Sequence, residues 1–243
     1  LECLSGVPGS TGATPIQNVG AYGQEVAETI TAVEAYDRVE GTTSRIAAAD
    51  CGFAYRGSIF KYSDRWVVLT VDFRLARSPL SGPVRYAELA RALGVEVGDR
   101  VPLAEARAAV LRLRAGKGMV LDDADPDTRS VGSFFTNPVL DQEAYGLLRE
   151  RAADLGEPPS WPCPGDMVKV SAAWLIDKAG FGKGHPGPGG VAISSKHTLA
   201  LTNRSGRAST ADLVALARQI REGVHARFGV TLHPEPVLVN CAI

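Results

Sequence analysis

The chain has 243 residues, of which 45% are hydrophobic and 22% charged, and its formal net charge is −1. These proportions are typical of a folded globular protein with one large or two small domains, and they exclude a disordered chain. The near-neutral charge argues against nucleic acid as a partner, and no apolar run approaches the roughly 18 residues of a transmembrane helix.

The first part of the chain combines a glycine-rich loop with two strands. Residues Gly6–Gly23 contain five glycines and two prolines and predict an irregular loop with tight turns. Strands are predicted over Thr29–Tyr36 and Val67–Leu75. In the second strand, alternation predicts a half-buried strand with one apolar face, formed by Val67, Leu69, Val71, Phe73 and Leu75.

Helical patterns dominate the middle of the chain. They begin at Tyr86 and strengthen over Leu103–Leu113, where alanine and leucine recur at helical spacing. The polar, aspartate-rich stretch Gly116–Ser133 is typical of a loop, and Tyr145–Leu155 predicts a short helix.

The last third alternates helices with extended segments. Ser171–Ala179 predicts a helix that ends at Gly180, and Val191–Leu201 predicts extended chain. The clearest helix is Ala211–Phe228, capped by Ser209 or Thr210 and ended by Gly229. A final extended run is expected over Thr231–Val239. The predicted fold class is therefore α+β.

The glycine-rich loop is the first candidate site. Glycines allow left-handed backbone and a close approach of N–H groups to an anion, and Ser10 and Thr11 add hydroxyl donors. The loop matches neither the P-loop nor the dinucleotide fingerprint, so a phosphate cradle and a plain connection remain equal alternatives. The paired amides of Gln17 and Asn18 suit a planar, hydrogen-bonding ring.

Four other polar residues have both a chemical and a structural interpretation. Ser133 lies beside two phenylalanines outside any nucleophile elbow, and its context alone favours a structural serine at a strand edge. Glu235 is a carboxylate between two prolines in an apolar run, either buried with a partner or facing outward. Arg56 suits a carboxylate ligand or an ordinary surface position, and Lys117 suits a phosphate or a solvated loop.

The cysteines and histidines predict no metal site. Four cysteines and four histidines are scattered without a CxxC pair or a ligand spacing. So few cysteines in a long chain are typical of a reducing cytoplasm.

Five segments, taken together, point to a family. They are GVPGSTGATPIQNVGAYG, FAYRGSIFK, KGMVLDDADPDTRSVGSFFTNPVL, AAWLIDKAGF and RFGVTLHPEPVLV, in this order. The chain resembles the UDP-N-acetylenolpyruvoylglucosamine reductase family, also called UDP-N-acetylmuramate dehydrogenase, and within it the type I, actinobacterial-like branch. The resemblance extends from Gly6 to Val239, and its specificity comes from the agreement of several motifs in order.

The resemblance implies a cytoplasmic, monomeric flavoenzyme of peptidoglycan precursor synthesis. FAD is the implied cofactor and NADPH the co-substrate, and UDP-N-acetylglucosamine enolpyruvate is reduced to UDP-N-acetylmuramate. The implied organisation is the second subdomain of a vanillyl-alcohol-oxidase-type FAD-binding domain over residues 1–119, an α+β substrate-binding domain over 120–229, and a return to the FAD-binding domain over 230–243.

The resemblance also implies roles for individual residues. Ser133 matches the proton donor, Glu235 the carboxylic acid near the substrate carboxylate, and Arg56 the catalytic arginine. Substrate-binding positions are matched by Tyr86, Lys117 and Asn137. The flavin-binding positions are Gly9, Ser10, Thr11, Gly12, Gln17, Asn18, Gly20 and Tyr22.

One part of the family pattern is missing. The Gly-Gly-Ser-Asn-like loop of the N-terminal FAD subdomain does not occur in this sequence. We therefore expect these residues to be a C-terminal part of a reductase that binds FAD poorly by itself. The alternatives are another FAD-dependent oxidoreductase of the same superfamily and a nucleotide-sugar-binding fragment without flavin.

Overall fold

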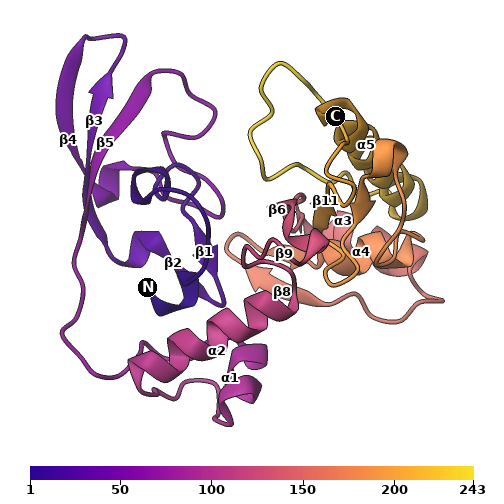
Figure 1. Ribbon diagram of the computed structural model, residues 1–243, viewed down its shortest axis with the longest axis horizontal. Helices are drawn as coiled ribbons and strands as arrows, with labels where there is room; N and C mark the ends of the chain where they lie inside the picture. Colours follow the sequence, from indigo (N-terminus) through magenta and orange to yellow (C-terminus); the bar gives the residue numbers. More distant parts are fainter. The chain divides into compact units, whose positions relative to one another are not determined.

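The computed structural model describes residues 1–243 and divides into two compact units, Leu1–Gly116 (unit 1) and Lys117–Ile243 (unit 2). Figure 1 shows small antiparallel sheets and helices in both, and this confirms the α+β class. None of the helices combines the length and the apolar character that crossing a membrane would require.

Unit 1 is built around one three-stranded antiparallel sheet of order β4-β3-β5. Its strands are β1 (Gly20–Ala21), β2 (Gln24–Glu25), β3 (Ile30–Asp37), β4 (Thr42–Ala47) and β5 (Trp66–Phe73), and its α-helices are α1 (Ala87–Leu93) and α2 (Leu103–Gly116). Short 3-10 helices occupy Glu2–Leu4, Thr11–Ala13, Val26–Glu28 and Ala48–Asp50. Both predicted strands and both predicted helices are confirmed, whereas β4 had no prediction.

The predicted apolar face of β5 is wrong. Val67 and Leu69 are about half exposed, and Val68 packs against the core instead. The cause is a shift in register: Val68 pairs with Ala35 and Thr70 with Glu34, so Leu69 is an extra residue. Such a bulge reverses the alternation, and it returns Val71 to the buried side.

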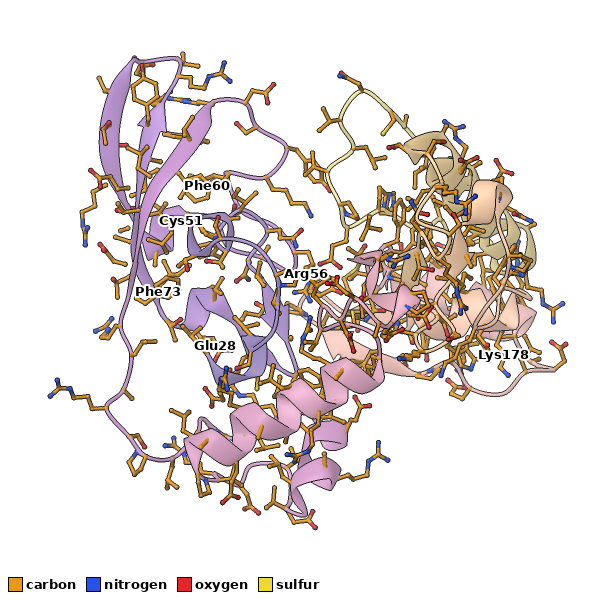
Figure 2. All side chains as sticks on the ribbon, viewed as in Figure 1. Glu28, Cys51, Arg56, Phe60, Phe73 and Lys178 are labelled. Atoms are coloured by element: carbon orange, nitrogen blue, oxygen red, sulfur yellow. The ribbon has the colours of Figure 1, made fainter.

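The core of unit 1 lies against one face of this sheet. Cys51 and Phe60 are buried there beside the partly buried Phe73, and Figure 2 labels all three. A second cluster joins α1 and α2 through Leu89, Val110 and their neighbours. These two clusters fix the segments that carry the candidate site of unit 1.

The β3–β4 turn is held by a buried carboxylate. Asp37 is 4% exposed and accepts hydrogen bonds from Arg65 Nε at 2.9 Å and from the backbone N–H of Val39 at 2.9 Å. The hydrogen bond from Arg65 lowers the pKa of Asp37 from 3.8 to about 2. The ionised carboxylate therefore stabilises the folded state at neutral pH.

We expect this stabilisation to disappear in acid. Because the folded-state pKa is lowered, the contribution is complete above 3.8 and is lost as the pH falls toward about 2. Urea unfolding tests the effect across this range, with and without Asp37→Asn. It is followed by the fluorescence of Trp66 in a background where Trp161 and Trp174 are replaced by phenylalanine. The free energy of unfolding should fall more steeply in the native protein, and equal slopes would contradict the prediction.

Unit 2 contains two three-stranded antiparallel sheets, of order β10-β11-β6 and β7-β9-β8. The strands are β6 (Ser130–Ser133), β7 (Val139–Leu140), β8 (Ser160–Cys163), β9 (Met167–Val170), β10 (Ala192–Ile193) and β11 (Ala200–Thr202). The helices are α3 (Gln142–Arg151), α4 (Ala172–Lys178) and α5 (Thr210–Phe228), with 3-10 helices at Pro126–Thr128 and Pro188–Gly190.

Helix α5 confirms its prediction at both ends. Ser209 is the N-cap, and its hydroxyl accepts from the N–H of Asp212 at 3.2 Å while the Asp212 carboxylate accepts from the N–H of Ser209 at 2.8 Å. Gly229 ends the helix in the left-handed conformation, with φ of 72°. The apolar stripe of α5 packs into the core of unit 2, through Leu216, Ala217, Ile220 and Val224.

Three other expectations for unit 2 are corrected. The end of the predicted loop Gly116–Ser133 is strand β6, because these residues pair with β11. The predicted extended segment Val191–Leu201 is interrupted: only the short strands β10 and β11 are extended, they pair with each other, and residues 194–199 between them form no strand. Residues Thr231–Val239 form no strand, since the prolines there lack the N–H that a ladder needs, and a single bridge joins Pro234 to Phe135.

The C-terminal residues pack on unit 2. Val230 and Leu232 are buried in its core, and Arg221 donates to the carbonyl oxygen of Ile243 at 2.5 Å. The division into a flavin-binding part, a substrate-binding part and a returning tail at residues 119 and 229 stays a prediction for the family's complete architecture.

Candidate functional site

The glycine-rich loop Gly6–Gly23 presents unbonded backbone donors. The N–H groups of residues 9–12 form no hydrogen bond within the protein, and Gly9, Ser10 and Thr11 are exposed. Gly9 has φ of 114°, a conformation that favours glycine, and a Cβ on Gly9 or Gly12 would meet no atom within 4 Å. Open N–H groups beside two hydroxyls suit a diphosphate, so this loop fits a phosphate-bearing cofactor.

Asn18 holds the second half of the loop. It is 1% exposed, and its Nδ2 donates to Glu25 Oε2 at 2.8 Å and to the carbonyl of Ala54 at 3.1 Å, while its Oδ1 accepts from the N–H of Ala27. The side chain of Asn18 is therefore engaged within the protein. It fixes the path of the neighbouring Gln17 and of Gly20.

Arg56 occupies a strained turn. The bridge between Ala54 and Gly57 closes a tight turn, and Arg56 is its third residue, with φ of 53°. A positive φ at this position is usual for glycine in a type II turn. A non-glycine residue there costs roughly 1–2 kcal/mol, and such strain is concentrated at functional sites.

The guanidinium of Arg56 is fixed against the loop. Its Nη2 donates to the carbonyl of Gly20 at 2.8 Å, and its Nη1 lies 3.9 Å from Glu25 Oε1. A Cβ on Gly20 would lie 2.9 Å from the carbonyl oxygen of Gln24 and 3.0 Å from Nη1, so glycine leaves room for this close approach. Arg56 is labelled in Figure 2.

Two residues around Arg56 had no prediction from sequence. Glu25 is the acidic partner, and Lys61 donates to the carbonyl oxygen of Arg56 at 3.0 Å. Lys61 lies within the segment FAYRGSIFK that carries the family resemblance, so its place in that motif was the available signal.

Tyr22 and Tyr86 form an edge-to-face pair with ring centroids 5.5 Å apart. Burial raises the pKa of Tyr22 to about 12 and also raises that of Tyr86. Both hydroxyls therefore stay protonated and can donate at neutral pH. Tyr86 is the N-cap residue of α1, and Arg85 beside it pairs with Glu28 at 2.8 Å.

Ser133 is aimed by a bulge in β6. Ser133 pairs with Ala200 and Ser130 with Thr202, so β6 has one residue more than β11 between these pairs. Gly132 provides the extra residue, with φ of 73°. Bulges of this kind redirect a side chain. The hydroxyl of Ser133 forms no hydrogen bond within the protein and is partly exposed, so it can face a ligand.

The bulge gives a testable prediction about glycine. A Cβ would meet no atom within 4 Å at either Gly132 or Gly146, but only Gly132 has a positive φ. We expect Gly132→Ala to destabilise the protein by about 1–2 kcal/mol and the control Gly146→Ala, inside α3, to stabilise it by about 1 kcal/mol. Thermal unfolding of both variants measures the difference, and equal shifts would contradict it.

Glu235 is brought beside Ser133 by backbone pairing. The N–H of Glu235 donates to the carbonyl of Phe134 at 2.8 Å, and the N–H of Thr136 donates to the carbonyl of His233 at 3.0 Å. Phe134 and Phe135 are each 1% exposed and anchor this junction in the core. A hydroxyl and a carboxylate are thus carried by neighbouring backbone.

The two other site residues predicted in unit 2, Asn137 and Lys117, lie in different structural environments. Asn137 Oδ1 accepts from the N–H of Ala172 at 2.9 Å at the start of α4, and its Nδ2 has no partner within the protein. Lys117 is partly buried and precedes Gly118, at which a Cβ would lie 3.2 Å from Asp127 Cβ.

Asp127 organises the turn before β6 and was missed from sequence. It is 2% exposed, and its Oδ2 accepts from Ser195 Oγ at 2.5 Å. Arg204 lies 3.8 Å from its Oδ1, and the neighbouring Asp125 pairs with Lys196 at 2.5 Å. These contacts join the segments on both sides of β11 to the start of β6.

Each unit thus brings together some of the site residues predicted from the sequence. Unit 1 brings Arg56 to Gly20 and pairs Tyr22 with Tyr86. Unit 2 brings Ser133 to Glu235. No three His, Cys, Asp or Glu side chains are grouped to hold a metal ion, and all four cysteines are free.

Comparisons with known proteins agree on one family. The family described as "UDP-N-acetylenolpyruvoylglucosamine reductase, C-terminal domain" matches residues 125–239. A UDP-N-acetylenolpyruvoylglucosamine reductase from Salinispora arenicola is 83% identical over all of this chain and 67% of its own length. Those from Thermobifida fusca and Streptomyces coelicolor are 59% and 62% identical, again over the whole chain, which covers 69% and 64% of them.

A solved structure supports the fold. The crystal structure of UDP-N-acetylenolpyruvylglucosamine reductase from Thermus caldophilus matches 97% of this chain and 62% of its own, with a TM-score of 0.61 and 24% identity. The chain therefore spans about two thirds of the length of the relatives it matches. The identity to the curated relatives shows that the chain belongs to the UDP-N-acetylenolpyruvoylglucosamine reductase family of peptidoglycan synthesis.

Proposed function

We propose that this chain carries the substrate-reducing residues of an NADPH-dependent reductase that converts UDP-N-acetylglucosamine enolpyruvate to UDP-N-acetylmuramate. The observation that carries this proposal is the pairing of Ser133 and Glu235 on adjoining backbone, with the Ser133 hydroxyl unbonded within the protein. The strained, fixed Arg56 supports it.

The loop Gly6–Gly23 is the proposed place of FAD. Its open N–H groups at residues 9–12 and the hydroxyls of Ser10 and Thr11 would hold phosphate, and Gln17 with the backbone around Gly20 would face the ring system. FAD, when bound, supplies the redox chemistry by relaying a hydride from NADPH to the substrate double bond.

The residues of this chain would handle charge and protons. Hydride addition to the enolpyruvyl methylene carbon puts negative charge on the substrate carboxylate. Arg56 would stabilise that charge as it develops, and Glu235 is the acid proposed to lie near the same substrate carboxylate. Ser133 Oγ would then give its proton to the neighbouring carbon, because a strongly basic carbanion can take a proton from a weak acid held in place.

Three further residues are proposed to bind the sugar nucleotide. Tyr86 offers a protonated hydroxyl, and Asn137 offers the two N–H donors of Nδ2 that have no partner within the protein. Lys117 would approach the diphosphate as a cation. We also propose a monomeric, cytoplasmic protein, on the strength of the family resemblance alone.

About one third of the length of the relatives lies outside the region that this chain matches, so the first quantity to measure is FAD binding by this chain. Visible absorption during titration with FAD, followed by anaerobic NADPH and then the enolpyruvyl sugar nucleotide, tests the proposal. Bleaching by NADPH and recovery with the sugar nucleotide are expected of the reductase.

Two other outcomes favour the alternative functions. Bleaching without recovery would favour another FAD-dependent oxidoreductase of the superfamily. Absence of flavin binding, together with retained binding of the sugar nucleotide in calorimetry, would favour a nucleotide-sugar-binding fragment.

A further inference from the structure

Lys61 is buried beside Arg56, one of the candidate-site residues with a left-handed backbone. It is 9% exposed, and its Nζ donates to the carbonyl oxygen of Arg56 at 3.0 Å. Its ammonium also lies 4.9 Å from the centroid of the Tyr62 ring. A buried ammonium is costly unless its donors are used, so these contacts tie the position of Lys61 to that of the turn.

The segment that carries Lys61 is held by packing and hydrogen bonds. Phe60 is buried and packs edge to face against Trp66, and Ser58 Oγ donates to the carbonyl of Ile16 at 2.6 Å. The backbone of Lys61 donates to the carbonyl of Ser58 at 3.3 Å. The backbone of Lys61 is therefore held in place while its side chain extends to the turn at Arg56. No other lysine lies within unit 1.

The hydrogen bond acts on the carbonyl of the strained residue itself. Arg56 has φ of 53°, and rotation of its peptide toward an ordinary conformation would move both that carbonyl and the side chain. The guanidinium would then leave the carbonyl of Gly20, to which Nη2 donates at 2.8 Å. Lys61 opposes this rotation because its ammonium would lose the hydrogen bond to the Arg56 carbonyl.

We propose that Lys61 is a positioning residue that holds the Arg56 turn in its left-handed conformation and so keeps the guanidinium aimed at the loop. The importance of this guanidinium orientation for catalysis rests on the proposed function. The effect of Lys61 on the conformation of Arg56 does not depend on it. Lys61 acts through Arg56 and touches no substrate in this scheme.

The first test measures the order of the Arg56 side chain. The variants are Lys61→Met, which keeps the apolar stem and removes the ammonium, and Lys61→Arg, which restores a cationic donor. The control is Lys178→Met, at an exposed lysine labelled in Figure 2. ¹⁵N relaxation of the guanidinium Nε, assigned with Arg56→Lys, reports the side-chain order in each protein.

We expect the Arg56 Nε signal to be rigid in the native protein and in Lys178→Met. It should approach the mobility of exposed arginines in Lys61→Met and recover most of its order in Lys61→Arg. An equally rigid Arg56 in Lys61→Met overturns the proposal, as does mobility that Lys61→Arg leaves unchanged.

A double-mutant cycle remains decisive if Lys61→Met is too unstable for relaxation measurements. Glycine adopts the left-handed conformation without strain, so Arg56→Gly should reduce the need for Lys61. The shift in unfolding midpoint caused by Lys61→Met should be less than half as large in the Arg56→Gly background as in the native one. Equal shifts in the two backgrounds overturn the proposal.

Turnover separates this inference from the proposed function. Where the FAD-loaded native protein reduces the enolpyruvyl sugar nucleotide, Lys61→Met should lower kcat about tenfold or more and change KM little. Absence of turnover in the native protein would contradict the proposed function alone, since Arg56 order and the cycle still decide the role of Lys61.

Discussion

Replacing Ser133 by alanine is expected to lower the turnover of the enolpyruvyl sugar nucleotide by about 10³-fold, the middle of the range for a positioned proton donor. Reduction of the flavin by NADPH should be unchanged, because that half-reaction needs no proton from Ser133. Stopped-flow absorption of the flavin measures the two half-reactions separately in the FAD-loaded protein.

The fold should tolerate this change. Ser133 Oγ forms no hydrogen bond within the protein, so its removal leaves no buried partner unsatisfied, and the bulge is made by Gly132. Ser44→Ala is the matched control, since Ser44 is an exposed serine in strand β4. Unchanged turnover in Ser133→Ala would remove Ser133 from the proton-donor role, and an equal loss in Ser44→Ala would show that the assay reports something else.

The sequence predicts elements whose signals are local. Helix α5 is recognisable because Ser209, the apolar stripe and Gly229 lie within one continuous segment, and the structure confirms each of them. The face of β5 is different. Its alternation is broken by a bulge at Leu69, which depends on pairing with β3 more than thirty residues earlier in the chain. No pattern within β5 itself contains that information.

The residues of the candidate site also fall into those that the sequence identifies and those that it does not. Ser133 and Glu235 were assigned by family resemblance. They lie near each other because of a backbone hydrogen bond between Phe134 and Glu235, which are 101 residues apart in the sequence. Lys61 and Asp127 were missed because their partners are a carbonyl oxygen and a distant serine. A backbone carbonyl is present at every residue, so the sequence does not reveal which one a lysine will meet.

The anchor of the Ser133–Glu235 junction is Phe134, and its truncation has the largest expected effect on stability. Phe134 is 1% exposed, its ring packs 5.0 Å from that of Phe135, and its carbonyl accepts from the N–H of Glu235. We expect Phe134→Ala to lower the free energy of unfolding of unit 2 by about 3–5 kcal/mol, through lost burial and the cavity left behind.

Urea unfolding followed by the fluorescence of Trp174 measures this loss, in a background where Trp66 and Trp161 are replaced by phenylalanine. Trp174 packs on Phe228 in the core of unit 2, so its signal reports that unit. The control is Leu121→Ala, because Leu121 is 79% exposed and its truncation should change stability by less than about 0.5 kcal/mol. Equal unfolding midpoints for the two variants would mean that Phe134 does not anchor the junction. In that case the alignment of Ser133 with Glu235 would depend on the backbone pairing alone.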